Sequence, residues 1–157
     1  MAAPHKTNVM RLLDQAGISY KVHTYAGTGT MSGADVARTL GQNPAQVFKT
    51  LVTVAKSGRH CVFVVPVEKE LHLKKAAQSA GEKAVEMLKQ KDLLPTTGYV
   101  HGGCSPIGMK KPFFTVVDQS AAQFETILMS AGKIGFQVEL RPQDLQKIVP
   151  FVYGSIT

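Results

Sequence analysis

The sequence contains no tryptophan, only two cysteines and few charged residues, which make up 18% of the chain. Two cysteines do not make the disulfide framework of a small secreted domain, and no spacing typical of metal ligands is present, so we expect no metal. No apolar run approaches the ~18 residues needed to span a bilayer. The segment 1–6 lacks the apolar stretch of a signal peptide. These absences predict a protein of the reducing cytoplasm with no membrane partner.

The remaining composition is that of a soluble globular protein. The 157 residues are 44% hydrophobic, which suits a single domain over residues 1–157 and is enough to bury a core. The 18 lysines and arginines outnumber the 11 aspartates and glutamates, and the net charge is +7. An excess of this sign favours a polyanionic partner such as RNA, although many basic proteins bind no nucleic acid.

Hydrophobic periodicity and turn residues predict helices and strands in mixed order. We expect helices over residues 8–16, 32–40, 71–80 and 142–149, with a helical turn before Pro95, and strands over 18–25, 47–55, 61–65, 84–87, 113–117, 124–129 and 135–140. In the first strand, alternation places Ile18, Tyr20 and Val22 on one face, as in a half-buried strand. Residues 26–30 form a flexible loop. Hairpin signals in both halves predict an α/β domain of the α+β type with a mixed sheet, not a doubly wound parallel one.

The segment 102–111 joins two apolar runs and combines three glycines with one proline, one serine and two lysines. Such a loop can aim backbone N–H groups at an anion or a developing oxyanion, and an ordinary turn fits it equally well. It is no P-loop, because Met109 stands where that motif needs lysine. The pair Gly27 and Gly29 lacks the third glycine of a dinucleotide site, so we expect no cofactor. Residues 130–135 form a second loop of small residues.

Lys49 is the most informative charge in the sequence. It stands at the head of an apolar strand, and alternation gives it the same face as Val47 and Leu51. A lysine among apolar neighbours either extends to solvent at the strand end or binds a phosphate or a carbonyl oxygen. If Lys49 and the two small-residue loops converge, they form a binding pocket.

The candidate nucleophiles are Cys104 and Ser105 in the first loop. Neither has a base beside it in the sequence, although His101 precedes Cys104 closely enough to allow a Cys–His pair. The sequence therefore supplies no convincing nucleophile or base of its own.

Three motifs resemble, in order, those of the YbaK/EbsC-type aminoacyl-tRNA deacylases: residues 47–52, residues 102–108, and residues 130–135 followed by Glu139-Leu140. That family comprises free-standing relatives of the editing domain of bacterial prolyl-tRNA synthetase. The resemblance runs from about Val9 to about Val149, and residues 12–25 are similar to the Cys-tRNA(Pro) deacylase branch. It implies a compact domain with a mixed, curved sheet flanked by helices, and trans-editing of mischarged Cys-tRNA(Pro). The implied partners are the 3′ CCA end of an aminoacyl-tRNA and prolyl-tRNA synthetase in a transient complex.

The resemblance also implies functional residues. It assigns catalysis to Lys49, Gly102 and Gly103, and substrate binding to Tyr25, Phe48, Thr50, Cys104, Ser105, Pro106, Ser130, Gly132 and Lys133. Gln137 departs from the pattern, because some members carry an acidic residue there. The substrate's own thiol could attack the ester carbonyl while loop amides stabilise the oxyanion, or an ordered water could attack instead. The alternatives are a deacylase of different specificity, such as one for Ala-tRNA(Pro), and a non-catalytic tRNA-binding module.

Overall fold

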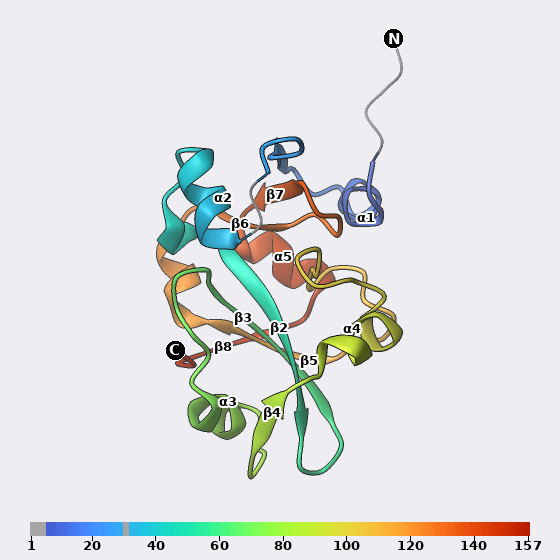
Figure 1. Cartoon of the computed structure of the whole chain (residues 1–157), viewed down its shortest axis with the longest axis vertical. Coiled ribbons are helices and arrows are strands. Elements are labelled where there is room, and N and C mark those ends of the chain that lie inside the picture. The colour runs from blue at the N-terminus through green and yellow to red at the C-terminus, as the bar shows by residue number, and fades with distance from the viewer. Residues whose placement is uncertain (1–5, 30–31) are drawn as a thin grey trace.

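A five-stranded mixed sheet forms the centre of the structure, a computed structural model that describes residues 6–29 and 32–157 (Figure 1). Its strands, in the order in which they pair, are β4 (Val85–Met87), β2 (Phe48–Ala55), β3 (His60–Pro66), β5 (Phe114–Asp118) and β8 (Val152–Gly154). β2 pairs antiparallel with β3 and β4, whereas β3 with β5 and β5 with β8 are parallel pairs. The predicted mixed sheet and the β2–β3 hairpin are confirmed, and β8 is a strand that the sequence pattern does not predict.

A second, three-stranded antiparallel sheet lies beside the first. Its strands pair in the order β1 (Lys21–Thr24), β7 (Phe136–Leu140) and β6 (Ile127–Ser130). Val47, just before β2, forms a parallel bridge with Leu128 in β6. This bridge ties the two sheets together next to the site described below.

The helices begin where the sequence places capping residues. α1 (Asn8–Gln15) and α2 (Gly33–Thr39) are capped by the hydroxyls of Thr7 and Ser32, each of which accepts a hydrogen bond from the first helical turn. α5 (Pro142–Ile148) begins with a proline, whose missing N–H is not needed there. The other helices are α3 (Leu73–Ser79), α4 (Gln90–Thr97) and the short 3-10 turns η1 (Pro44–Gln46) and η2 (Gln119–Gln123).

Both faces of the central sheet are covered. One face packs Val52, Val62 and Val64 against the smaller sheet, α1 and α5. The opposite face packs Phe63 and other apolar side chains against α3. β3 therefore has apolar surroundings on both sides, which explains why residues 61–65 are an unbroken apolar run rather than an alternating one.

Two predicted details are wrong. Val22 lies opposite the buried Val138 on the core face of the small sheet, but β1 is an edge strand and Val22 remains 48% exposed. α4 does not end before Pro95 but continues to Thr97. Pro95 cannot donate to the carbonyl four residues earlier, and because this helix surface is exposed, water can satisfy that carbonyl. The last residue of the predicted loop 26–30 lies outside the described residues.

Candidate functional site

The site begins at an unpaired stretch of β2. β4 pairs only with residues 53–55 and β6 bridges only Val47, so in the described part of the chain no strand pairs with residues 49–51 on that side. Val67 N–H donates to Val47 O, just before β2. Because backbone hydrogen bonds alternate between the two edges of a strand, the odd-numbered residues of β2 bond to β3. The N–H and C=O of Thr50 therefore point to the open side. Thr50 Oγ1 is also buried, and it has no hydrogen-bond partner among the described residues.

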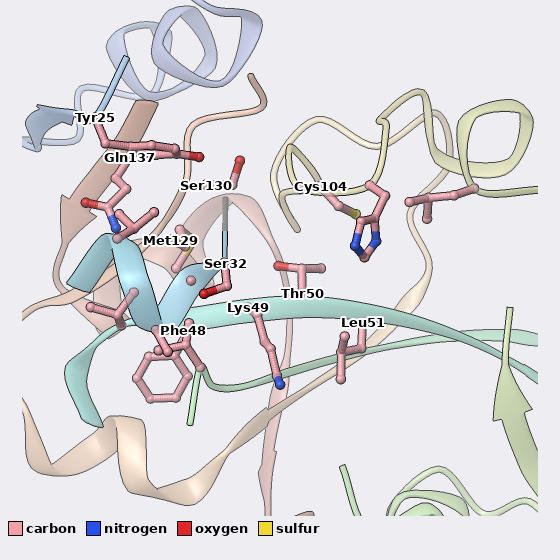
Figure 2. A pocket seen from close by; sticks show the side chains of 18 residues that line it. Tyr25, Ser32, Phe48, Lys49, Thr50, Leu51, Cys104, Met129, Ser130 and Gln137 are labelled. Carbon is pink, nitrogen blue, oxygen red and sulfur yellow. The ribbon is translucent and has the colours of Figure 1, made fainter. Parts of the chain in front are cut away.

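A cleft of about 340 Å³ surrounds this open edge. Its volume lies within the range of about 300–1,000 Å³ that is typical of small-molecule sites. Thr50 points to one side of β2, and Lys49 and Leu51 point to the other, so the cleft bends round the strand (Figure 2). α2 forms one wall. It approaches so closely at Gly33 that a Cβ there would lie 2.6 Å from Val67 Cγ1.

The glycine-rich loop, residues 102–111, forms the opposite wall. Gly103 N–H donates to Val100 O at 3.0 Å, and Gly102 has a φ of +89° at the third position of this turn, as a type II turn requires. A Cβ on Gly103 would lie 3.3 Å from Ile134 N, so the turn also packs closely on the second loop. Gly103 N–H is thus occupied, whereas no hydrogen bond within residues 6–29 and 32–157 engages the N–H of Gly102 or Cys104. Those two amides are the donors that this turn can offer to a ligand.

Ser105 and Pro106 are buried and hold the shape of the loop instead of lining the cleft. Ser105 Oγ accepts a hydrogen bond from Ile107 N–H at 3.2 Å. The hydroxyl of Tyr99 donates to the carbonyl of Ile107, and burial raises the pKa of Tyr99 to about 12, so the phenol stays protonated. Tyr99 also touches the second loop, because a Cβ on Gly132 would lie 3.1 Å from Tyr99 Cε1. One buried tyrosine thus holds both loops in place.

The second loop reaches the cleft through Ser130. Its Oγ accepts a hydrogen bond from Gly132 N–H at 3.1 Å, and Gly132 adopts a φ of +88° that favours glycine. Lys133 is exposed, and its Nζ lies 5.7 Å from the centroid of the Phe136 ring rather than in the cleft.

Cys104 lines the cleft as a protonated thiol. Burial raises its pKa to about 12, and the hydrogen bond with the side chain of Thr97 only partly offsets that effect. A thiol with this pKa is not a nucleophile at neutral pH. His101 lines the same cleft, but the side-chain contact of Cys104 is with Thr97, and the Cys–His pair that the sequence allows is not among the described interactions.

Gln137 borders the cleft with a neutral amide. It pairs with Gln42, whose Nε2 lies 2.7 Å from Gln137 Oε1, and the reverse hydrogen bond measures 3.3 Å. The cleft therefore has a satisfied amide at the position where the family resemblance led us to consider a carboxylate.

The predicted residues divide into two groups. The cleft brings together Tyr25, Phe48, Lys49, Thr50, Gly102, Cys104 and Ser130. The residues that do not line it are Gly103, Ser105, Pro106, Gly132 and Lys133. The sequence interpretation missed Ser32, Leu93 and Met129, and it gave no binding role to His101 or Gln137. Ser32 could have been suspected from the sequence, because it caps a helix just after segment 26–30, which the sequence predicts to be a flexible loop. Met129 could not, because its sequence pattern is that of an ordinary core residue.

The described residues contain no group of three or more His, Cys, Asp or Glu side chains that could hold a metal ion. Within the same residues, no helix combines the length and apolar character needed to cross a bilayer. Of the N-terminal segment 1–6, in which we expected no signal peptide, only Lys6 is described.

The sequence and the fold are both similar to those of known proteins. The model of the aminoacyl-tRNA editing domain family matches residues 28–148. A protein of Enterococcus faecalis named as a proposed Cys-tRNA(Pro)/Cys-tRNA(Cys) deacylase, EbsC, is 45% identical over 153 residues, which cover 97% of this chain and 93% of the relative.

Two solved structures share the fold. A hypothetical protein, APE2540, has a TM-score of 0.87 at 21% identity, with 96% of this chain and 99% of that one covered. A protein described as a proposed trans-editing enzyme for prolyl tRNA synthetase has a TM-score of 0.83 at 20% identity, with coverages of 100% and 99%. The mixed α/β fold expected from the sequence is thereby confirmed.

Proposed function

Because the chain belongs to the aminoacyl-tRNA editing domain family, we propose that it cleaves, in trans, the ester that joins a mischarged cysteine to tRNA(Pro). The 45% identical relative carries this substrate in its name. The cleft has the size and the mixed apolar and polar lining that a cysteinyl ester of a terminal adenosine needs. The protein then acts as an aminoacyl-tRNA deacylase on the 3′ CCA end of a charged tRNA.

The observation that carries this proposal is a cleft with unpaired polar groups for binding and no activated nucleophile. Thr50 presents an unpartnered Oγ1 and an open backbone edge, and the N–H groups of Gly102 and Cys104 are unengaged in the described residues. A hydrolase that uses its own nucleophile places a base within hydrogen-bond reach of it. Cys104 instead keeps its proton, with a pKa of about 12.

We assign the attack to the thiol of the substrate. Its sulfur bonds to the ester carbonyl carbon, the bond from that carbon to the ribose oxygen breaks, and the thiol proton passes to this oxygen. The products are a cysteine thiolactone, which water opens later, and a tRNA with a free terminal hydroxyl. The amides of Gly102 and Cys104 stabilise the oxyanion, and the cleft holds thiol and carbonyl in one compact conformer.

Lys49 binds the nucleotide part of the substrate in this proposal. Its side chain is half-buried on the face of β2 opposite Thr50, and it forms no salt bridge within the described residues. The ammonium group is therefore available to a phosphate or hydroxyl of the terminal nucleotide. Thr50, on the other face, meets the aminoacyl group, so the edge of β2 separates the two halves of the substrate.

We further propose that the identity of the tRNA comes from a transient complex with prolyl-tRNA synthetase. The cleft is large enough for the end of a charged tRNA and not for the features that distinguish one tRNA from another. Residues 1–157 act as one domain in this proposal, and the cytoplasm, where tRNAs are charged, is its place of action.

Deacylation of a panel of charged tRNAs by the purified protein tests the function. We expect release of cysteine from Cys-tRNA(Pro) and no release of proline from Pro-tRNA(Pro). If alanine is released from Ala-tRNA(Pro) faster than cysteine is released from Cys-tRNA(Pro), the proposed substrate is wrong and Ala-tRNA(Pro) takes its place. Binding of uncharged tRNA without turnover of any charged species would identify a non-catalytic module.

A further inference from the structure

The wall of the cleft that contains α4 and the glycine-rich loop is strongly basic. Residues 93–117 include no aspartate or glutamate, and Asp92 is the one carboxylate between residues 88 and 117. We call the exposed lysines of this wall the basic rim: Lys89, Lys91, Lys110 and Lys111. Within the described residues, none of them forms a salt bridge with a carboxylate. Their charge is therefore available to an external anion.

The basic rim adjoins the cleft. Leu93 of α4 and His101 of the following loop line the cleft itself. Lys110 is held against the end of α4, because its backbone N–H donates to Thr97 O at 3.1 Å and its Nζ lies 3.4 Å from Pro95 O. α4 and the loop after it lie together on one side of β2, with α2 on the other (Figure 1).

The other borders of the cleft carry no comparable cluster of unpaired lysines within the described residues; the second loop adds Lys133 alone. On α2, Arg38 is paired with Asp35. Val67 lines the cleft, and the chain directly beyond it carries the exposed side chains of Glu68, Lys69 and Glu70, whose charges sum to −1. A polyanion that approaches the cleft is therefore attracted on the α4 side and repelled beside Val67.

Two features of the basic rim fit a single-stranded nucleic acid. Lys89 and Lys91 stand at the start of α4, where the helix dipole favours a bound anion, and Asp92 is the one carboxylate in that turn. Leu94, Val100 and Ile134 are 51%, 48% and 43% exposed on α4 and the two loops. Unpaired nucleotides bind through neutralised phosphates combined with contacts to the faces of unstacked bases.

We propose that the basic rim binds the phosphate backbone of the unpaired acceptor end of tRNA, which enters the cleft across α4 and the glycine-rich loop. This inference rests on the proposed function, which places the 3′ end of a tRNA in the cleft. It fixes the direction of approach: the phosphates that precede the terminal adenosine cross the side of Lys110 and Lys111, away from Glu68 and Glu70.

Binding of uncharged tRNA, followed by fluorescence anisotropy over a salt series, tests the basic rim directly. The double variant Lys110→Ala/Lys111→Ala is compared with Lys74→Ala/Lys75→Ala, which removes the same charge from exposed positions on α3. We expect the rim variant to bind roughly 10-fold more weakly near 0.1 M salt, with a logarithmic salt slope smaller by about 2. The control should stay within about twofold of the wild type. Equal losses in the two variants, or no loss in either, would overturn the proposal.

Kinetics then separate the basic rim from the function of the cleft. The rim variant should have a higher KM for Cys-tRNA(Pro) and an unchanged kcat. Its KM for cysteinyl-adenosine should equal that of the wild type, because this substrate has no phosphates. Lys110→Arg/Lys111→Arg should restore binding, because the charges return. If no charged tRNA is deacylated, the proposed function fails, while the salt series still decides the role of the rim. Competition by an anionic phospholipid vesicle as effective as that by tRNA would contradict the assignment to RNA.

Discussion

Gln42 and Gln137 exchange two hydrogen bonds between their side-chain amides, at 2.7 Å and 3.3 Å. Gln137 is buried in β7 beside the cleft, and Gln42 lies in the connection that follows α2. The pair therefore ties α2, which is one wall of the cleft, to the small sheet. It leaves no net charge at this border of the cleft.

Replacing Gln137 should destabilise the protein as well as loosen that wall. Gln137→Ala leaves the amide of Gln42 without its partner, and we expect the free energy of unfolding to fall by about 1–3 kcal/mol. Gln143→Ala, at an exposed position of α5, should change it by less than about 0.5 kcal/mol. Urea unfolding measures both, and equal effects in the two variants would contradict the role of the pair.

Lys49 should be essential to turnover and dispensable for folding. Lys49→Ala removes the cation that binds the terminal nucleotide, and we expect kcat/KM for Cys-tRNA(Pro) to fall by roughly 100-fold, equivalent to about 2.7 kcal/mol. Lys56→Ala, just beyond the other end of β2, is the matched control. Turnover at the wild-type rate by a folded Lys49→Ala variant would remove Lys49 from the mechanism.

Cys104 should be almost inert toward alkylation in the folded protein. With its pKa raised to about 12 by burial, roughly one molecule in 10⁴ carries the thiolate at pH 8. A Cys61→Ala variant isolates this thiol, and iodoacetamide should modify it roughly 1,000-fold more slowly in the folded state than after denaturation. Labelling at the rate of a free thiol would restore Cys104 as a candidate nucleophile.

Glu139 should stabilise the fold in a pH-dependent way. Its pKa is lowered, first by the hydrogen bond from Thr126 Oγ1 at 2.6 Å and then by His23, whose Nε2 lies 2.7 Å from the carboxylate. Since the folded-state pKa is below the unfolded value of ~4.3, this stabilisation is complete above that value and is lost as pH falls through the folded-state pKa.

We expect Glu139→Gln to lower the free energy of unfolding by about 1–2 kcal/mol at pH 7, and by much less near pH 3. Glu86→Gln, on an exposed side chain of β4, is the control. A difference between wild type and Glu139→Gln that stays constant from pH 7 to pH 3 would be inconsistent with an ionised Glu139 as the stabilising species.

Most helices and strands could be predicted because their signals are local. Thr7 and Ser32 mark helix starts, because their hydroxyls can cap a helix. The unbroken apolar run of residues 61–65 predicts a strand covered on both faces. The separate small sheet could not be predicted, since β1 and β7 are joined by pairs such as Val22 with Val138, far apart in the chain. No local pattern encodes such a pairing.

The site was predictable only in part for a related reason. The sequence alone left two roles open for Lys49, and the family resemblance was needed to choose between them. The structure adds that Gly103 N–H is used within its own turn, which moves the expected oxyanion contact to Gly102 and Cys104. It also shows that Thr50 Oγ1 has no hydrogen-bond partner among the described residues. The sequence could not reveal this, because the open edge beside Thr50 exists only where the pairing with β4 ends.

The most direct test of the account is the rate of deacylation of Cys-tRNA(Pro) compared with that of Ser-tRNA(Pro). The two substrates have nearly the same shape and differ in the sulfur that we place as the nucleophile. We expect the cysteinyl ester to be cleaved faster by roughly 100-fold or more, because only it carries an attacking group held beside the carbonyl. Equal rates on the two substrates would contradict attack by the substrate thiol and would assign the step to water.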